Sequence, residues 1–487
     1  MQRGLRHRGS RVTAAASSLN RNPLDLWASR RIGIDAEELT RDAIAAYQLR
    51  ALQQTVAWAR RRSLFYGKRL AALPEGWPPA LQDFTAAPLT NPSDVAERGH
   101  QFLCVPQSEI SRIVSIESSG TSGLRKRIFF TADDQGLALD FFAGGVAAMA
   151  AAGDRMFIAL PGEREGSVGF QLARGIARAG VAPIPHGLVV DPAAALRRMD
   201  EERATLLIGL PTQVLALTLE RCDLARRVLR RLHTIVLCSD HVPQSLAERI
   251  RCSTGCKIYE HYGSTEMGLG GGVDCLAHTG YHLREADLYF EIVSPQTGEP
   301  LGVGEPGEVV FTTLNRTGMP LIRYRTGDLS RFVPGPCACG SPLRRLERVR
   351  DRAGNVARLG PSGAITIADL GEILFAIPAV HDFNATLVPG SPRQLQVCLY
   401  APHEPEAAVD EAYRALHMQL AIRSACAAGV LWLNVSSQRH PFPATGAKRT
   451  IKSLAPISRS ASKSSNSTSS VPSLLPADPR YSCAFPP

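Results

Sequence analysis

Ser118-Ser-Gly-Thr-Ser-Gly-Leu-Arg-Lys126 is the segment of this sequence that says most about its fold and function. It places hydroxyl groups, glycines and cations within one short stretch. Glycine lets a backbone turn and bring its N–H groups close to a ligand, while hydroxyls and cations add donors and positive charge. This mixture favours a phosphate-holding loop, with an ordinary Ser/Gly turn as the alternative. A Walker A loop is excluded, because Leu124 and Arg125 follow Gly123 where that motif needs Lys and Ser/Thr.

Three further motifs follow along the chain. They are Tyr262-Gly-Ser-Thr-Glu266, Arg323-Tyr-Arg-Thr-Gly-Asp328 and Thr445-Gly-Ala-Lys448. In this order, the four motifs resemble those of the adenylate-forming superfamily, which includes acyl-CoA synthetases, luciferases and carrier-protein adenylation domains. The stretch from Tyr281 to Asp328 resembles the phenylacetate–CoA ligase-like branch of that superfamily. The resemblance covers roughly residues 22–454.

The resemblance implies an α/β protein. Its large, multi-subdomain N-terminal domain would contain β/α layers, and a small, mobile α+β C-terminal domain would follow. We expect these parts in chain order: a disordered basic extension (1–22), a large domain that binds ATP and the acid (23–349), a hinge (350–352), the small domain (353–456) and a disordered Ser/Pro-rich tail (457–487).

Hydrophobic periodicity supports this fold class independently. From Arg155 onward, short apolar runs alternate with helical patterns, which is typical of parallel β/α layers. The expected strands are 156–160, 206–210 and 234–238, then an antiparallel pair at 288–293 and 307–313, and later 394–400 and 430–435. The expected helices are 38–67, 192–204, 212–220, 244–251, 368–376 and 405–425.

The activity implied by the resemblance is ATP-dependent activation of a carboxylic acid, aromatic acids included. An acyl adenylate would form with release of pyrophosphate, and the acyl group would then pass to CoA, giving acyl-CoA and AMP. An enzyme that loads the phosphopantetheine of a carrier protein shares every ATP-side motif and remains the alternative. The chemistry requires two anions to be held together and the charge on the phosphates to be neutralised.

By resemblance, the first motif clamps the β- and γ-phosphates of ATP. Its nucleotide-binding residues would be Ser118, Ser119, Gly120, Thr121, Ser122 and Gly123, and Lys126 would be catalytic. The family usually has proline directly before this lysine, whereas this chain has Arg125. The departure leaves the charge of the loop intact but weakens any expectation about its rigidity.

The second motif supplies adenine, phosphate and metal contacts by the same resemblance. Tyr262 would stack on adenine, Thr265 would bond the α-phosphate and Glu266 would hold Mg²⁺, with Gly263 and Ser264 completing the nucleotide-binding turn. A hard cation that bridges phosphates prefers carboxylate oxygen. The alternative is a surface turn with an incidental acid.

The third and fourth motifs supply a carboxylate and a lysine. Asp328 would bind the ribose, because one carboxylate can accept hydrogen bonds from both vicinal hydroxyls, and Arg352 in the hinge would also contact the nucleotide. Lys448 resembles the catalytic lysine of the C-terminal domain. The family usually has glycine directly before that lysine, so Ala447 is a departure and Lys452 is a rival. A solvated basic tail is the remaining alternative.

Cysteine and histidine residues suggest a structural metal site. Cys337-Ala-Cys339 has tight spacing, and Cys275, His278 and His282 lie some sixty residues earlier. Cysteine and histidine are the ligands that tetrahedral Zn²⁺ prefers, and some phenylacetate–CoA ligase-like proteins carry a comparable pairing. We favour Cys275, His282, Cys337 and Cys339 as ligands, with His278 as the alternate. Unlinked buried thiols are the competing interpretation.

Charge and composition limit the partners. The formal net charge is +10, but residues 1–22 carry arginines and no acid, and the Ser-rich tail is also basic. A small anionic substrate fits this balance as well as a polynucleotide does, although a zinc-stabilised nucleic-acid-binding module remains a less favoured alternative. No run is long and apolar enough for a membrane. The eleven scattered cysteines favour a reducing cytoplasm, and a monomer and a homodimer are equally compatible.

The acid itself is hardly specified by the sequence. Cys238-Ser-Asp240 ends an expected strand, where open parallel sheets place ligands. The glycine-rich stretch 268–272 is expected to line an acyl pocket or a CoA channel, but glycines permit close approach without saying what approaches.

Overall fold

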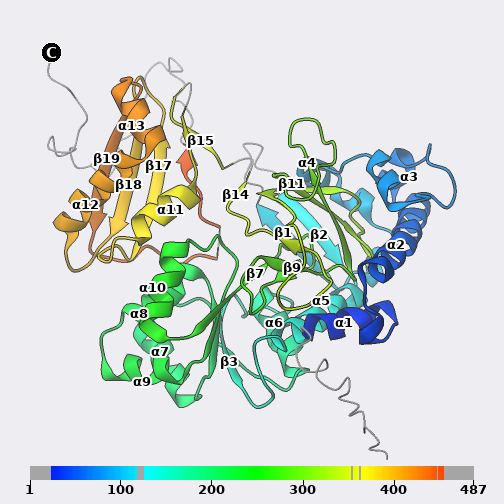
Figure 1. Ribbon diagram of the computed structural model, residues 1–487, viewed down its shortest axis with the longest axis horizontal. Coiled ribbons are helices and arrows are strands. Elements are labelled where there is room, and N and C mark those ends of the chain that lie inside the picture. Colours follow the sequence, from blue (N-terminus) through cyan, green and yellow to red (C-terminus); the bar gives the residue numbers. More distant parts are fainter. Residues whose placement is uncertain (1–22, 118–124, 353–354, 361–362, 447, 454–487) are drawn as a thin grey trace, which may run out of the picture.

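A twisted eight-stranded sheet forms the centre of the protein in this computed structural model, which describes residues 23–117, 125–352, 355–360, 363–446 and 448–453 (Figure 1). The strand order is β13-β9-β8-β7-β6-β5-β3-β4. Five strands are parallel: β3 (Arg155–Ala159), β4 (Ala182–Pro185), β5 (Leu206–Gly209), β6 (Thr234–Leu237) and β7 (Lys257–Tyr262). Three antiparallel strands extend it: β8 (Gly272–Val273), β9 (Tyr281–Leu283) and β13 (Arg345–Leu346).

Both faces of this sheet are covered by helices, and its central strands β3, β5 and β6 are mostly apolar, as two covered faces require. Successive residues point to opposite faces of a strand, so Met156 and Ile158 enter one core while Phe157 and Ala159 enter another. The first core contains α1 (Pro23–Ile32), α5 (Ala132–Val146) and α6 (Val168–Ala177). The second contains α7 (Pro192–Glu201), α8 (Pro211–Leu219), α9 (Asp223–Arg231) and α10 (Gln244–Thr254).

The N-terminal helices and two smaller sheets surround a third core. The helical segments are α2 (Arg41–Arg62), α3 (Leu64–Arg69), α4 (Pro92–Arg98) and the short 3₁₀ helices Ala36–Glu38, Leu81–Ala86, Gly99–Phe102 and Gln107–Glu109. One sheet has the order β10 (Leu288–Val293), β11 (Gly307–Thr313), β12 (Tyr324–Ser330) and β14 (Asp351–Arg352). The other is the hairpin of β1 (Arg112–Glu117) and β2 (Arg125–Phe130), whose connecting residues lie outside the described part.

A separate four-stranded sheet lies in the C-terminal part, with the order β19-β18-β17-β20. Its elements are β17 (Asp382–Val388), β18 (Arg393–Tyr400), β19 (Leu431–Gln438), β20 (Lys452–Ser453), α11 (Ile367–Phe375), α12 (Pro405–Met418) and α13 (Leu420–Ala427), preceded by the small pair β15 (Ala357–Arg358) and β16 (Ala364–Ile365). Figure 1 shows this unit beside α10 of the large sheet.

The contact between α10 and α11 joins the two parts of the molecule. At the N-terminus of α10, the backbone N–H groups of Gln244 and Ser245 donate to the Glu372 carboxylate at 2.9 and 3.1 Å. Farther along α10, Arg249 donates to four backbone carbonyls of the segment 375–380 that follows α11. A half-buried cation and an acceptor for helix-end amides therefore fix the C-terminal unit in this arrangement.

The mixed α/β class predicted from the sequence is confirmed, and most predicted elements lie within a few residues of the observed ones. Two predicted helices are each a pair of helices. Ser63 and Gln419 have extended backbone at the breaks, and each side chain accepts a hydrogen bond from the following helix. The predicted domain boundaries stay predictions, and residues 1–22 and 457–487 lie outside the described part.

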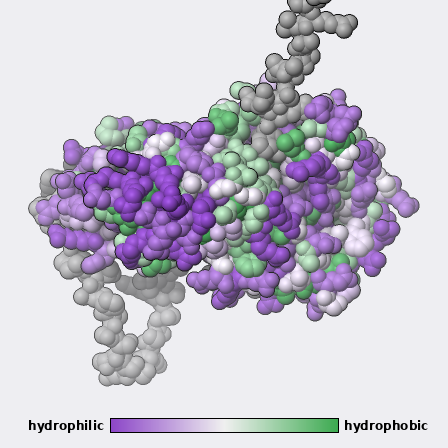
Figure 2. All heavy atoms as spheres, turned by 90° about the horizontal axis from the view of Figure 1, so that it is seen from below, coloured by the Kyte–Doolittle hydropathy of each residue, from purple (hydrophilic) through white to green (hydrophobic). Residues whose placement is uncertain are grey.

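The visible surface is mostly hydrophilic, with scattered hydrophobic side chains, when the molecule is seen from below (Figure 2). Among the described helices, none combines the length and the apolar character that crossing a bilayer requires.

Candidate active site

A buried ion pair joins two of the sequence motifs. Glu266 lies in the turn after β7, and its carboxylate pairs with the Lys126 ammonium from β2. The Tyr324 hydroxyl on β12 donates to the same carboxylate oxygen at 3.1 Å and accepts from Lys126 at 3.2 Å. Burial acts to raise the pKa of Glu266, but the Lys126 charge outweighs it and the pKa is lowered. The site therefore presents an ionised carboxylate beside a cation.

A second carboxylate lies on the same strand as Tyr324. Along β12 the buried residues alternate, so Tyr324 and Asp328 point to one face. The Tyr262 hydroxyl donates to Asp328 Oδ2 at 2.9 Å, and Arg352 Nε lies 2.6 Å from Asp328 Oδ1. Asp328 and Arg352 are opposite each other in the β12–β14 pair, which explains why a hinge residue reaches the motif aspartate.

The turn after β7 is closely packed. A Cβ on Gly263 would lie 2.3 Å from the Leu269 carbonyl oxygen, so no larger residue fits without moving the backbone. Ser264 Oγ accepts from the Met267 N–H, and the Thr265 carbonyl accepts from the Gly268 N–H. These bonds hold Glu266 beside Lys126. The predicted phosphate-loop residues Ser118, Ser119, Gly120, Thr121, Ser122 and Gly123 lie outside the described part.

The structure places the Lys448 segment over the carboxyl edge of the large sheet. A Cβ on Gly446 would lie 3.3 Å from Pro161, which follows β3. The backbone N–H of Arg449 donates to Asp240 Oδ2 at 3.3 Å, just beyond β6. Lys448 is exposed there and acts electrostatically on Asp240. Its rival Lys452 is an exposed residue of β20, paired with Thr386.

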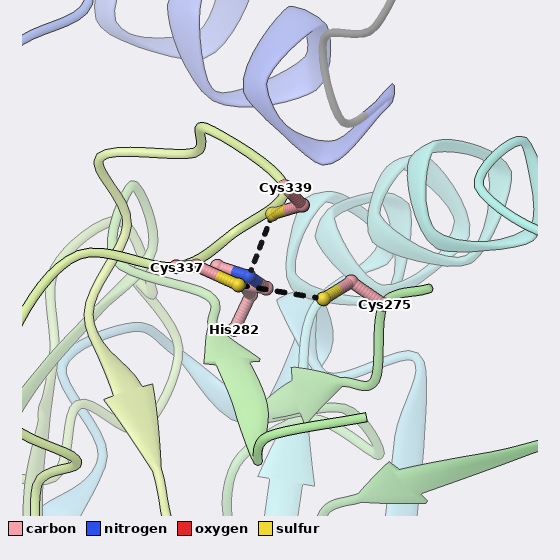
Figure 3. A group of neighbouring side chains, drawn as sticks. All are labelled: Cys275, His282, Cys337 and Cys339. Carbon is pink, nitrogen blue, oxygen red and sulfur yellow. Dashed lines mark hydrogen bonds between the residues drawn. The ribbon is translucent and has the colours of Figure 1, made fainter. Parts of the chain in front are cut away.

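Three cysteines and one histidine form a compact group beside the large sheet (Figure 3). The ligand atoms of Cys275, His282, Cys337 and Cys339 all lie within 4.8 Å of one another. Cys275 Sγ is 3.7 Å from Cys337 Sγ, and Cys339 Sγ is 3.2 Å from His282 Nε2. These are the four residues favoured from the sequence. His278 instead pairs with Asp274 at 2.7 Å and is not in this group.

The surroundings of His282 suit a metal ligand. Its Nδ1 lies 3.2 Å from the Leu343 carbonyl oxygen, a bond that assigns the proton to Nδ1 and leaves Nε2 facing the thiols. The hydrogen bond from Cys275, with burial opposing it and His282 adding to it, lowers the pKa of Cys339 below its usual range. A set of three cysteines and one imidazole fits tetrahedral zinc, and four protein ligands leave no position for water.

An apolar cavity of about 690 Å³, measured with its open mouth, begins next to Gly263. Its walls come from α5, α6 and the large sheet, and the lining includes Phe141, Phe142, Gly145, Val146, Met149, Leu172, Ile208 and Val236. The residues that follow β3 and β6, Leu160 and Ser239, also border it. The cavity thus reaches the edge of the sheet over which the Lys448 segment lies.

Several residues of the site were not predicted from the sequence. Tyr324 was inside a quoted motif but received no role, although its spacing of four from Asp328 on a strand would have placed both on one face. Glu260 and Tyr281 form a buried hydrogen bond of 3.1 Å behind Tyr262, and burial raises the pKa of Glu260 to about 7. His261 borders the cavity. No sequence signal marked these last three residues.

Comparison with known proteins gives concordant matches. The AMP-binding enzyme family matches residues 90–316. Phenylacetate-coenzyme A ligase from Thermus thermophilus is 28% identical over 365 residues, covering 71% of this chain and 78% of that protein. The Escherichia coli ligase of the same name is 29% identical over 329 residues, covering 65% and 72%.

Solved structures show the same fold. 2-Hydroxyisobutyryl-CoA ligase in its postadenylation state has a TM-score of 0.71 at 19% identity, over 86% of this chain and 91% of that chain. The same ligase in its thioesterification state has a TM-score of 0.60 at 20% identity, over 85% and 90%.

Proposed function

We propose that this chain, which belongs to the adenylate-forming superfamily on its phenylacetate–CoA ligase-like branch, is an AMP-forming acyl-CoA ligase. The family and branch predicted from the four motifs are confirmed by these matches. The enzyme uses ATP to convert a carboxylic acid to an acyl adenylate with release of pyrophosphate. It then transfers the acyl group to the thiol of CoA and releases AMP.

The observation that carries the proposal is the convergence of separate motifs on one buried polar site. Lys126, Glu266 and Asp328 come from a hairpin, a turn after β7 and a strand of the second sheet. The Tyr324 hydroxyl contacts the Lys126–Glu266 pair, and Tyr324 and Asp328 share one face of β12. These groups suit a nucleotide, with phosphates beside the ion pair and ribose beside Asp328.

Each residue then has a defined task. Lys126 and the loop 118–123 hold the phosphates, and Thr265 bonds the α-phosphate. Tyr262 stacks on adenine, Gly263 and Ser264 complete the turn, and Asp328 with Arg352 holds the ribose. Glu266 is buried and ionised, so it fits a Mg²⁺ ligand. When bound, the metal would neutralise charge on the phosphates.

The C-terminal unit supplies the remaining cation. The Lys448 segment lies over the sheet edge that the cavity reaches, so its ammonium can stabilise negative charge as pyrophosphate leaves. We propose that the unit turns about residues 350–352 after adenylation. This movement withdraws Lys448 and lets the thiol approach.

The thiol that accepts the acyl group distinguishes an acyl-CoA ligase from an enzyme that loads a carrier protein. Pyrophosphate release from ATP, measured across alkyl, aryl and amino acids, tests the first half-reaction. Thioester formation is then compared between free CoA and a carrier protein bearing phosphopantetheine. We expect CoA to be the better acceptor. A preference for the carrier would establish the alternative, and no pyrophosphate release with any acid would refute both.

The Cys275, His282, Cys337 and Cys339 group is proposed to hold one structural Zn²⁺. We expect metal analysis of the purified protein to find about one zinc per chain. Cys337→Ser combined with Cys339→Ser should abolish zinc binding and lower the melting temperature. Cys222→Ser, at an exposed free cysteine, is the matched control. Stable wild-type protein without zinc would refute the site. Thiolate ligands of this kind suit a reducing cytoplasm, which we keep as part of the proposal.

A further inference from the structure

His261 is a polar side chain in an otherwise apolar part of the cavity. It lies on β7, and its ring is 6.3 Å from that of Phe141 and 6.1 Å from that of Phe142. Its Nε2 is inaccessible to solvent and lies against Gly270, where an added Cβ would be 3.3 Å away, so this nitrogen is closed to a ligand. No hydrogen bond to Nδ1 is found among the described residues, and the ring borders the cavity. A polar group without a partner costs free energy, so Nδ1 is suited to a partner that arrives with a ligand.

The cavity offers no charge to a ligand. The described residues that line it are aliphatic, aromatic, sulfur-containing or glycine, apart from Ser239 and His261. A second carboxylate or an ammonium on the acid would therefore be buried without a counter-charge, which is strongly unfavourable. An acid that fits this cavity has an apolar body, and its only ionised group is the reacting carboxylate, which lies outside the apolar part.

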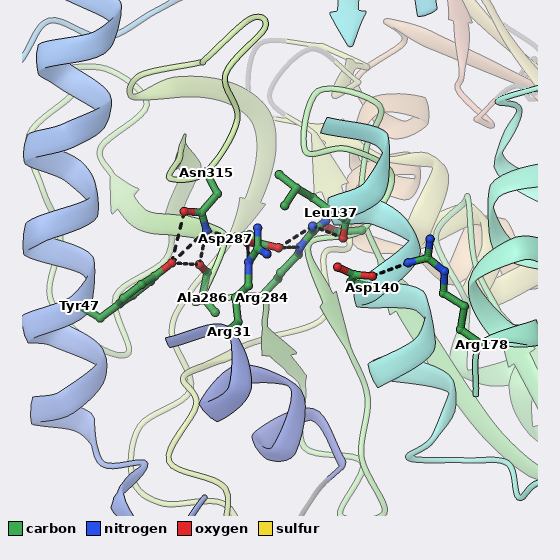
Figure 4. A network of polar contacts seen from close by, with 10 residues as sticks. Arg31, Tyr47, Leu137, Asp140, Arg178, Arg284, Ala286, Asp287 and Asn315 are labelled. Atoms are coloured by element: carbon green, nitrogen blue, oxygen red, sulfur yellow. Dashed lines mark hydrogen bonds and ion pairs between the residues drawn. The ribbon is translucent and has the colours of Figure 1, made fainter. Parts of the chain in front are cut away.

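Arg284 joins Leu137 of α5 to Asp287 in a network of polar contacts (Figure 4). It is fully buried, pairs with Asp287 and donates to the Leu137 carbonyl of α5 at 2.6 Å. It also donates to the Gly270 carbonyl at 3.3 Å, and its guanidinium lies 4.8 Å from the centre of the Phe141 ring. One cation thus joins α5 to the glycine-rich stretch, and Phe141 and Gly270 from these two segments lie near the imidazole.

The same surroundings keep His261 neutral. Burial, with the positive charge of Arg284 adding to it, lowers the pKa of His261 to about 4. A neutral imidazole has one nitrogen that donates and one that accepts a hydrogen bond. It can therefore bind a hydroxyl or carbonyl group without requiring a charge on the ligand.

We propose that His261 is a specificity-determining residue, and that the acid is an apolar carboxylic acid with one uncharged hydrogen-bonding group, a hydroxyl or a carbonyl, on its body. This inference rests on the proposed adenylation activity and names the substrate class of the same site. His261 recognises the group on the body of the acid, away from the reacting carboxylate.

Matched acids test the inference by pyrophosphate release. Phenylacetate is compared with each of its ring-hydroxylated isomers, and hexanoate with its hydroxy derivatives and with the dicarboxylate adipate. In the wild type, at least one hydroxylated acid should exceed its parent roughly tenfold or more in kcat/KM, because it alone satisfies the imidazole. Adipate should be a poor substrate.

Substitutions at the histidine then locate the preference. His261→Phe should remove the preference for the hydroxylated acid while the parent acid still reacts within a few-fold of the wild-type rate. If the wild type shows no preference, or if His261→Phe retains it, the inference is overturned. If His261→Phe does not fold, His261→Gln decides. The amide of His261→Gln places its hydrogen-bonding atoms differently from the imidazole, so a different hydroxylated isomer should be preferred. If the isomers keep the wild-type order of kcat/KM, the inference is overturned.

The two proposals can fail separately. If unsubstituted acids release pyrophosphate and hydroxylation makes no difference, the adenylation activity stands and the role of His261 is refuted. If no acid of the panel releases pyrophosphate, the adenylation activity fails and this inference fails with it.

Discussion

The polar site around Glu266 and the apolar cavity beside it share β7 but are built in different ways. In the polar site, each charged group has a specific partner, as in the Lys126–Glu266 pair and the Tyr262–Asp328 hydrogen bond. In the cavity, many aliphatic and aromatic side chains from α5, α6 and the sheet each contribute a small part of one surface. The nucleotide, which is the same in every reaction, can be held by a few specific polar groups. The body of the acid is held by many apolar side chains, and each of these can be replaced by another of similar size.

The largest effect in this comparison is expected from the C-terminal lysine. Lys448→Ala removes a cation that stabilises departing pyrophosphate, so adenylation should slow by roughly a thousandfold. Transfer of the acyl group from presynthesised acyl adenylate to CoA should remain near the wild-type rate, because that step does not use the cation. Rapid-quench measurements of the two half-reactions would show the split.

Lys452→Ala is the matched control, since both lysines are exposed and four residues apart. It should leave both half-reactions nearly unchanged. If the two lysines exchange these phenotypes, Lys452 is the catalytic residue. If neither substitution has an effect, the C-terminal unit does not contribute a lysine to adenylation.

Lys126→Ala should slow adenylation by roughly a hundredfold, because it removes a charged contact with the phosphates. The structure adds a pH dependence. Without Lys126, burial remains as the main influence on Glu266 and raises its pKa, so its metal-binding form is lost as the pH falls. The defect should therefore deepen toward acidic pH. Wild-type kinetics in this variant would refute the assignment, and Lys68→Ala, at an exposed lysine of α3, is the control.

Glu266→Gln keeps the shape of the side chain and removes the charge that would hold Mg²⁺. Half-maximal adenylation should then require on the order of tenfold more Mg²⁺. A magnesium titration at saturating ATP measures this change. Glu299→Gln, at an exposed glutamate, should not alter the titration, and an unchanged requirement in Glu266→Gln would assign the metal to another residue.

The smallest effect is expected on the acid side. Gly145 lines the cavity, and a Cβ added there meets no atom within 4 Å. Gly145→Leu should fill part of the cavity and raise KM roughly several-fold for bulky acids, with little change for short acids or for ATP. Steady-state kinetics with acids of increasing size would show this. An equal change for all acids would place acid binding elsewhere.

The fold was largely predictable because buried strands and helices leave strong patterns. The apolar runs of β5 and β6 are visible in the sequence, because their side chains enter a hydrophobic core on each face of the sheet. The predicted single helix at 405–425 is interrupted at Gln419, whose extended backbone ends α12 and whose side chain caps α13. No glycine or proline marks this break in the sequence.

The candidate site was predictable only on its nucleotide side. Residues proposed to bind phosphate or ribose occur in short motifs. The four proposed zinc ligands are cysteines and a histidine, residue types that attract attention in a sequence. His261 and Arg284 had no such mark, because a buried histidine or arginine gains its role from partners that the motifs do not contain. Those partners are known only once the chain is folded.

The docking of the C-terminal unit through Arg249 and Glu372 has a kinetic consequence. If the unit turns between half-reactions as proposed, the bonds to the carbonyls of segment 375–380 and to the N–H groups of Gln244 and Ser245 must break and re-form in every turnover. The strength of these bonds then sets the lifetime of the adenylating arrangement. A substitution of Arg249 or Glu372 therefore alters which step limits the overall rate, although neither residue contacts ATP, acid or thiol.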